Sequence, residues 1–141
     1  MRAAALIALA LAVGAPPAAF AADPAGCTEV AGILEDAVEK WPDLLSTQRV
    51  KPRLAAVQIA TTAGIAVNYA IDGGWTQAEQ APIIALRDTR ELSMDDPTYS
   101  KANAPGLLHG YLGQIAAVLA GKCPTTAAPD ISGLSTDYPE S

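Results

Sequence analysis

The residue in this chain best suited to acid–base chemistry is its single histidine, His109. A lone imidazole can serve as an acid, a base or a pH sensor close to neutral pH. Zinc and di-iron sites built from several histidines are excluded, because only one is present. No nucleophile can be named beside it. An enzyme that uses His109 with Asp95 or Asp96 is therefore an alternative hypothesis, and we expect no metal ion and no cofactor.

The two cysteines, Cys27 and Cys123, are the other candidates for chemistry. A reactive thiolate needs a neighbouring cation or imidazole to stabilise it, and no histidine lies close in sequence to either cysteine. Two cysteines near the ends of a small exported domain usually pair, and the leader described below directs export. We therefore expect one disulfide between Cys27 and Cys123.

Three cations, Arg49, Lys51 and Arg53, gather where a helix is predicted to begin. The positive end of the helix dipole disfavours cations there by a few tenths of a kcal/mol each, so a negative group is expected to compensate. Ion pairs with the acidic end of a later helix are one explanation. The other is a small anion or an acidic partner held by these side chains and by free backbone amides.

The first residues of the chain have the three parts of a cleavable secretory signal peptide. Arg2 supplies the positive start, residues 3–13 are apolar, and Ala19 and Ala21 provide the small residues of a cleavage site. The apolar run is too short to span a bilayer. We expect residues 1–21 to be removed and the protein to be exported, to the periplasm or outside the cell.

The charge balance argues against nucleic acid as a partner. Nine Lys and Arg stand against fifteen Asp and Glu, a net charge of −6, and removing Arg2 with the leader makes it −7. Nucleic acids and anionic membrane surfaces favour basic patches. We therefore expect no nucleic-acid partner and no strong membrane association.

Helical periodicity runs through the rest of the chain, without the alternation of a half-buried strand. An apolar stripe predicts a first helix over residues 28–41, ended by Pro42. A second helix is predicted over residues 52–71, because proline suits its first position and the glycines at 73 and 74 suit its end.

Two further helices follow. The pair Thr76 and Glu79 matches a capping box, in which each side chain satisfies a free backbone amide of the other residue. Pro82 indicates either a short turn followed by a helix over residues 82–92 or one bent helix over the whole stretch. The last helix is predicted over residues 103–122, with leucines on its inner face.

The second helix carries no charge from Leu54 to Ile71 and is apolar on most of its circumference. We expect it to be the most buried helix. A membrane span competes with this interpretation, but alanine-rich sequence with several polar side chains inserts poorly. A membrane-associated accessory subunit therefore stays an alternative.

The predicted fold class is all-α, an up-down-up-down bundle of four helices over residues 22–123. An even number of helices returns the chain to the end where it began, so both cysteines share that end and a disulfide can clamp it. Residues 124–141 are rich in Pro, Thr, Ser, Ala and Asp, which predicts a disordered tail.

The same topology gathers charge at the opposite end, which we call the charged pole. The candidate site residues there are Arg49, Lys51, Arg53, Asp95, Asp96, Tyr99 and His109. The sequence thus predicts an exported, non-enzymatic binding module that recognises a protein partner or a small anionic ligand at the charged pole.

Overall fold

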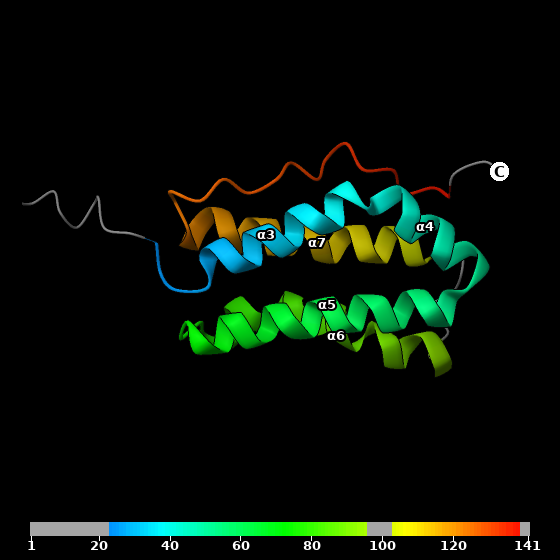
Figure 1. The fold of residues 1–141 in the computed structure, drawn as a ribbon, viewed down its shortest axis with the longest axis horizontal. Helices are drawn as coiled ribbons and strands as arrows, with labels where there is room; N and C mark the ends of the chain where they lie inside the picture. The colour runs from blue at the N-terminus through cyan, green and yellow to red at the C-terminus, as the bar shows by residue number, and fades with distance from the viewer. Residues whose placement is uncertain (1–22, 96–102, 139–141) are drawn as a thin grey trace, which may run out of the picture.

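The structure is a computed structural model of the 141-residue chain, and it describes residues 23–95 and 103–138. Within these residues it has no strand and five α-helices, shown in Figure 1: α3 (Cys27–Glu39), α4 (Trp41–Val50), α5 (Pro52–Asp72), α6 (Gln77–Asp95) and α7 (Ala104–Lys122). The all-helical class is confirmed. The four-helix bundle is not confirmed, because the described helices number five. The expected leader over residues 1–21 lies outside the described residues.

The additional helix is α4, which occupies residues that we expected to form a loop. Lys40 is both the C-terminal cap of α3 and the N-terminal cap of α4, with φ −93° and ψ 9°. Pro42 lies in the first turn of α4, where its missing N–H costs no hydrogen bond. The proline therefore begins a helix, although the sequence interpretation made it the end of one.

The predicted limits of α5 and α7 are close to those observed. Pro52 is in the first turn of α5, and Gly74 follows its end with φ 74°, a left-handed conformation that glycine adopts without steric cost. The helix α7 begins at Ala104 and ends at Lys122, within a residue of the predicted range.

The start of α6 has the predicted capping box. The Thr76 backbone N–H donates to Glu79 Oε1 at 2.8 Å, and the Glu79 backbone N–H donates to Thr76 Oγ1 at 3.1 Å. The helix continues through Pro82, so of the two predicted alternatives the structure has the single helix over the whole stretch.

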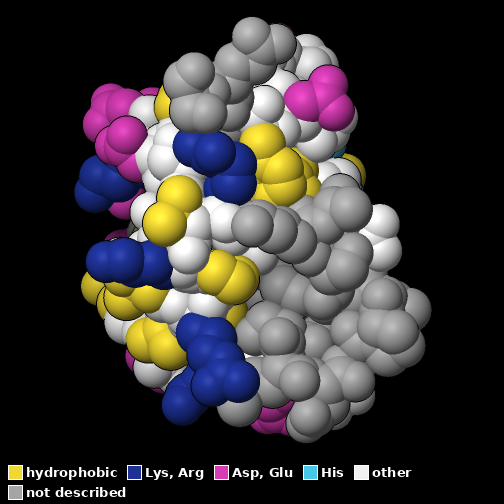
Figure 2. All heavy atoms as spheres, turned by 90° about the vertical axis from the view of Figure 1, so that its right-hand side faces the viewer, with side chains coloured by type: hydrophobic (Ala, Val, Ile, Leu, Met, Phe, Trp, Pro, Cys, Tyr) yellow, Lys and Arg dark blue, Asp and Glu magenta, His cyan; other side chains and the backbone are white. Residues whose placement is uncertain are grey.

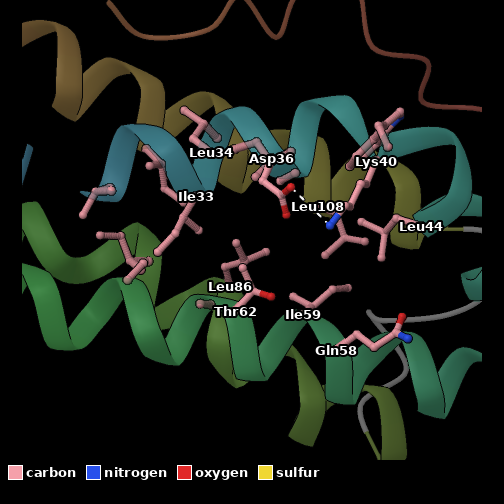
Figure 3. A pocket seen from close by; sticks show the side chains of 18 of the residues that line it. Ile33, Leu34, Asp36, Lys40, Leu44, Gln58, Ile59, Thr62, Leu86 and Leu108 are labelled. Carbon is pink, nitrogen blue, oxygen red and sulfur yellow. Dashed lines mark ion pairs between the residues drawn. The ribbon is translucent and has the colours of Figure 1, made fainter. Parts of the chain in front are cut away.

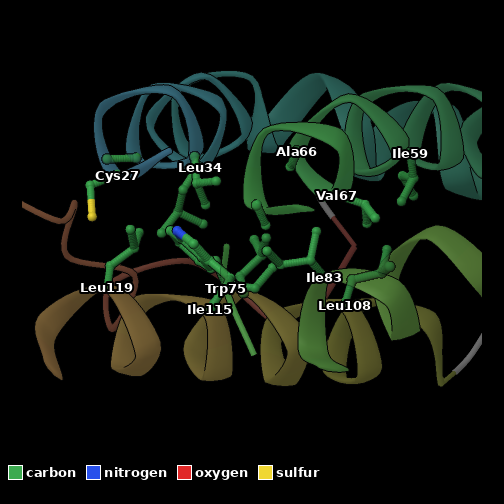
Figure 4. Packing of buried hydrophobic residues seen from close by; sticks show 14 of the residues in the cluster. Cys27, Leu34, Ile59, Ala66, Val67, Trp75, Ile83, Leu108, Ile115 and Leu119 are labelled. Carbon is green, nitrogen blue, oxygen red and sulfur yellow. The ribbon is translucent and has the colours of Figure 1, made fainter. Parts of the chain in front are cut away.

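The helices form two layers around a shared core. In Figure 1, α3, α4 and α7 lie on one side of the molecule and α5 and α6 on the other. Figure 4 shows Leu34, Trp75, Ile83, Leu108 and Ile115 converging between them. The buried face of α5 contributes mainly alanine, which lets neighbouring helices approach its backbone closely.

The expected disulfide between Cys27 and Cys123 is confirmed, with the two Cα atoms 5.8 Å apart. Beside it, the Trp75 Nε1–H donates to the carbonyl oxygen of Ala25 at 2.9 Å. A Cβ placed on Gly73 would lie 2.1 Å from the same oxygen, so only glycine fits there. We call this region the clamped end; it consists of Ala25, Cys27, Gly73, Trp75 and Cys123.

Residues 124–138 lie along the bundle, in contrast to the disordered tail that we expected (Figure 1). The Trp41 Nε1–H donates to the carbonyl oxygen of Ser135 at 2.8 Å, and His109 Nε2 is 3.0 Å from the carbonyl oxygen of Ile131. The apolar side chains that pack on the core are Ala128, Ile131, Leu134 and Tyr138. These few spaced side chains anchor a segment whose average composition is polar.

The helix α5 has one buried face and one exposed face. Large side chains on its outer face are exposed to solvent, with Leu54 45%, Val57 44%, Ile65 48% and Tyr69 43% exposed. In its most apolar stretch, 39% of the residues are buried. Among the described helices, α5 is the one whose length and composition would allow it to cross a membrane, a test that core helices of soluble proteins also pass.

Candidate functional site

The three predicted cations lie at the junction of α4 and α5. Lys51 and Arg53 are exposed, and Arg49 is partly buried. Among the described residues, the Nε atom of Arg49 is buried without a hydrogen-bond partner. No ion pair joins any of the three to a described acidic residue; Asp88, for example, pairs with Arg87 at 3.0 Å. The ion pairs expected to compensate these cations are thus absent from the part of the chain that the structure describes.

The acidic and aromatic members of the charged pole cannot be placed as a site. Asp96 and Tyr99 lie outside the described residues, and for Asp95 the structure gives the helical backbone but not the side chain. Figure 2 looks onto this end of the molecule and shows the Lys and Arg side chains at separate places, divided by hydrophobic side chains. The described part of the charged pole therefore forms no single cluster.

His109 faces the C-terminal segment. Its Nε2 contacts the carbonyl oxygen of Ile131 at 3.0 Å, and its ring meets that of Trp41 edge to face with centroids 6.4 Å apart. No carboxylate among the described side chains bonds to it. The arrangement holds the ring between α7 and the segment, and it lacks the base or nucleophile that a catalytic role would require.

A different feature stands out between α3–α4 and α5, where the helices leave an open groove of about 390 Å³. We call it the central groove. One wall comes from α3 and α4, between Val30 and Thr47, and the other from α5, between Gln58 and Ala66. Its size is within the usual range for small-molecule sites, which are concave and mostly apolar.

The floor of the central groove is apolar. The side chains that form it come from three helices: Ile59, Ile83, Leu86, Leu108, Leu112 and Ile115. Most of them belong to the buried core, so the groove opens directly onto the hydrophobic interior. Such a floor favours an apolar ligand, since covering apolar surface releases about 25 cal/mol per Å².

The mouth of the groove is polar. Lys40 Nζ pairs with Asp36 Oδ1 at 3.2 Å, and Figure 3 shows this pair above the opening with Gln58 and Thr62 on the opposite wall. Asp43 adds a second carboxylate on the α4 side. An apolar floor below a polar mouth suits a molecule with one apolar and one polar part.

The sequence interpretation missed this site. Asp36 and Lys40, which were not among the candidate site residues, both line the groove. The usable signal was on α5: Gln58 and Thr62 are four residues apart on a helix without charge in its interior, so both lie on one face. A polar pair of this kind indicates a face that is not fully covered by neighbouring helices.

The described residues contain no group of three His, Cys, Asp or Glu side chains that could hold a metal ion, and both cysteines are in the disulfide. What the central groove offers is burial of apolar surface together with a few polar groups at its mouth.

Comparison with known proteins assigns no relationship. No family matches the chain, and neither the curated proteins nor the solved structures contain a match.

Proposed function

We propose that this protein is a small, non-enzymatic binding protein whose ligand is an amphiphilic small molecule held in the central groove. The observation that carries the proposal is the groove itself, about 390 Å³ in volume, with a floor made of core side chains and a polar mouth. The proposal keeps the binding class expected from the sequence. It moves the site from the charged pole to the face between α3–α4 and α5.

The setting of the groove supports binding over catalysis. The disulfide fixes the start of α3 against the end of α7, so part of the frame around the groove is preformed. A preformed site binds with a smaller loss of conformational entropy. The disulfide is consistent with an oxidising compartment, and the leader over residues 1–21 predicts export. Export would place the protein where small amphiphiles from outside the cytoplasm reach it.

The test is a matched pair of substitutions on α5. Thr62 lines the groove, whereas its neighbour Thr61 is exposed and does not line it. Thr62→Phe fills the groove, and Thr61→Phe adds the same ring outside it. Calorimetric titration with decanol, a neutral single-chain probe, should give binding to the wild type and to Thr61→Phe, and at least tenfold weaker binding to Thr62→Phe.

Circular dichroism melting of both variants checks that they fold. If the folded Thr62→Phe variant binds decanol as well as the wild type does, the groove is not the site. If the wild type itself does not bind decanol, the proposed function is wrong.

A second candidate function, a membrane-associated accessory subunit, rests on the outer face of α5. Its exposed Leu54, Val57 and Ile65 recur at helical spacing and form an apolar stripe on a helix without charge in its interior. Sedimentation with phosphatidylcholine vesicles should then retain the protein through a salt wash, and Ile65→Ser should release it. A protein that stays in the supernatant would contradict this candidate.

A further inference from the structure

We propose that the amphiphile bound in the central groove carries a positive charge on its polar end, because the groove mouth holds two carboxylates and one ammonium group. This inference rests on the proposed function and adds the chemical class of the ligand. The charged residues that line the groove are Asp36, Lys40 and Asp43.

The charge of Lys40 is already compensated within the protein. Its Nζ is 3.2 Å from Asp36 Oδ1, and the two residues are one helical turn apart on the same wall. An anionic ligand would have to draw Lys40 away from Asp36 and would then lie beside an unpaired carboxylate. The Asp36–Lys40 pair therefore adds no net charge to the groove mouth, and it would bind an anion poorly.

The carboxylate of Asp43 is the charge left over. Within the described residues, its side chain has no ion pair and no hydrogen bond; only its backbone oxygen is engaged, by the Thr47 hydroxyl at 3.0 Å. Asp43 lies in the first turn of α4, where the helix dipole favours a negative group. The groove mouth thus has a net charge of −1, which a cation on the ligand would complement.

The opposite wall accepts the same kind of group. Gln58 and Thr62 face the mouth from α5, and they offer a side-chain carbonyl and a hydroxyl oxygen that can accept hydrogen bonds from an ammonium group (Figure 3). The chain as a whole has a net charge of −6, so it also attracts cations at longer range. Both effects favour a cationic amphiphile over an anionic one.

The experiment compares three probes with the same apolar chain: decylammonium, decanol and decanoate, each titrated below its solubility limit and any micelle concentration, at low salt and neutral pH. The Coulomb energy of an exposed pair, about 1 kcal/mol, corresponds to about a fivefold change in affinity. Decylammonium should bind about fivefold more tightly than decanol, and decanoate should bind more weakly than decanol. Added salt should reduce the difference.

Two variants locate the charge. Asp43→Asn should remove the preference for the cation, so that decylammonium and decanol bind this variant with similar affinities. Glu35→Gln is the matched control, because it removes one exposed charge from α3 outside the groove and so preserves the preference.

The outcomes separate the two proposals. If decanol binds but the cation has no advantage, or if Asp43→Asn keeps the advantage, the inference on charge is overturned and the groove remains the site. If decanol does not bind the wild type, the proposed function fails and the inference fails with it.

Discussion

The two ends of the molecule are built differently. At the clamped end, a disulfide joins α3 to α7, the indole N–H of Trp75 bonds to Ala25, and Lys122 Nζ pairs with Glu79 Oε1 at 3.1 Å. At the charged pole, the described cations Lys51 and Arg53 are exposed and have no side-chain partner within the described residues. The disulfide and the Lys122–Glu79 ion pair are thus at the clamped end, whereas His109 of the charged pole contacts Trp41 and Ile131 without a covalent link or an ion pair.

The contacts that stabilise the fold and the residues that the sequence suggested as a binding site therefore lie at different ends of the molecule. The clamped end joins residues far apart in the chain, such as Asp23, whose carboxylate accepts hydrogen bonds from Thr125 and Thr126. Contacts between such distant segments reduce the freedom of the unfolded chain or hold the folded one together. Substitutions at the clamped end should therefore cost far more free energy of unfolding than substitutions at the pole.

The largest effect is expected from removing the disulfide. The double variant Cys27→Ala with Cys123→Ala should lose about 2–5 kcal/mol of unfolding free energy, the range typical of a small secreted domain. Urea titration followed by circular dichroism measures the loss, and reduction of the wild-type protein should reproduce it. A loss below about 0.5 kcal/mol would show that other contacts hold the clamped end, contrary to the comparison.

The second-largest loss of unfolding free energy is expected from a substitution at Gly73, which lies close to the backbone of Ala25. Gly73→Ala places a Cβ 2.1 Å from the Ala25 carbonyl oxygen, so the backbone must shift, at a cost of about 1–3 kcal/mol. Gly110→Ala is the control: nothing described lies within 4 Å of its added Cβ, and alanine should stabilise α7 by about 1 kcal/mol. Thermal melting of both variants should therefore show shifts of opposite sign, and shifts of the same sign would contradict this account.

A smaller effect depends on pH. The pKa of Glu79 is lowered from its ordinary value of 4.5, first by the hydrogen bond from the Thr76 backbone N–H and then by Lys122. A pKa that is lower in the folded protein stabilises it above pH 4.5, and this contribution is lost as the pH falls through the folded-state value. The wild type should thus be more stable than Glu79→Gln at neutral pH, and the difference should shrink in acid. A difference that is constant from neutral pH to pH 3 would contradict the assignment.

The smallest effect is expected at the charged pole. Lys51→Ala and Arg53→Ala should each change the unfolding free energy by less than about 0.5 kcal/mol, because both side chains are exposed. Urea titration measures the change. A loss above about 1 kcal/mol from either substitution would mean that the pole also holds the bundle together.

The features that were predicted correctly from the sequence depend on a few specific residue types. The capping box of Thr76 and Glu79, the start of α5 at Pro52 and the disulfide each depend on a few residue types with one favoured arrangement. Pro42 was ambiguous, since proline suits both the residue after a helix and the first turn of the next one. That ambiguity accounts for the missed helix α4 and hence for the wrong number of helices.

The site and the C-terminal segment depend on contacts between distant residues. The groove is lined by residues of all five described helices, and no local pattern records how helices far apart in the chain pack together. The segment is held by backbone carbonyls of Ile131 and Ser135, which every residue type provides, so composition could not reveal it. Prediction from sequence was therefore good for the limits of α5 and α7, and poor for the division between α3 and α4 and for the surfaces that helices leave open.

The two tryptophans lie in different parts of this arrangement, and each can report on its own surroundings. Trp41 lines the groove and donates its indole N–H to Ser135, whereas Trp75 is buried at the clamped end. With Trp75→Phe, the emission spectrum would follow groove occupancy and detachment of the C-terminal segment; with Trp41→Phe, it would follow opening of the clamp. The protein thus carries two intrinsic fluorophores that can observe ligand entry and unfolding separately, without an added label.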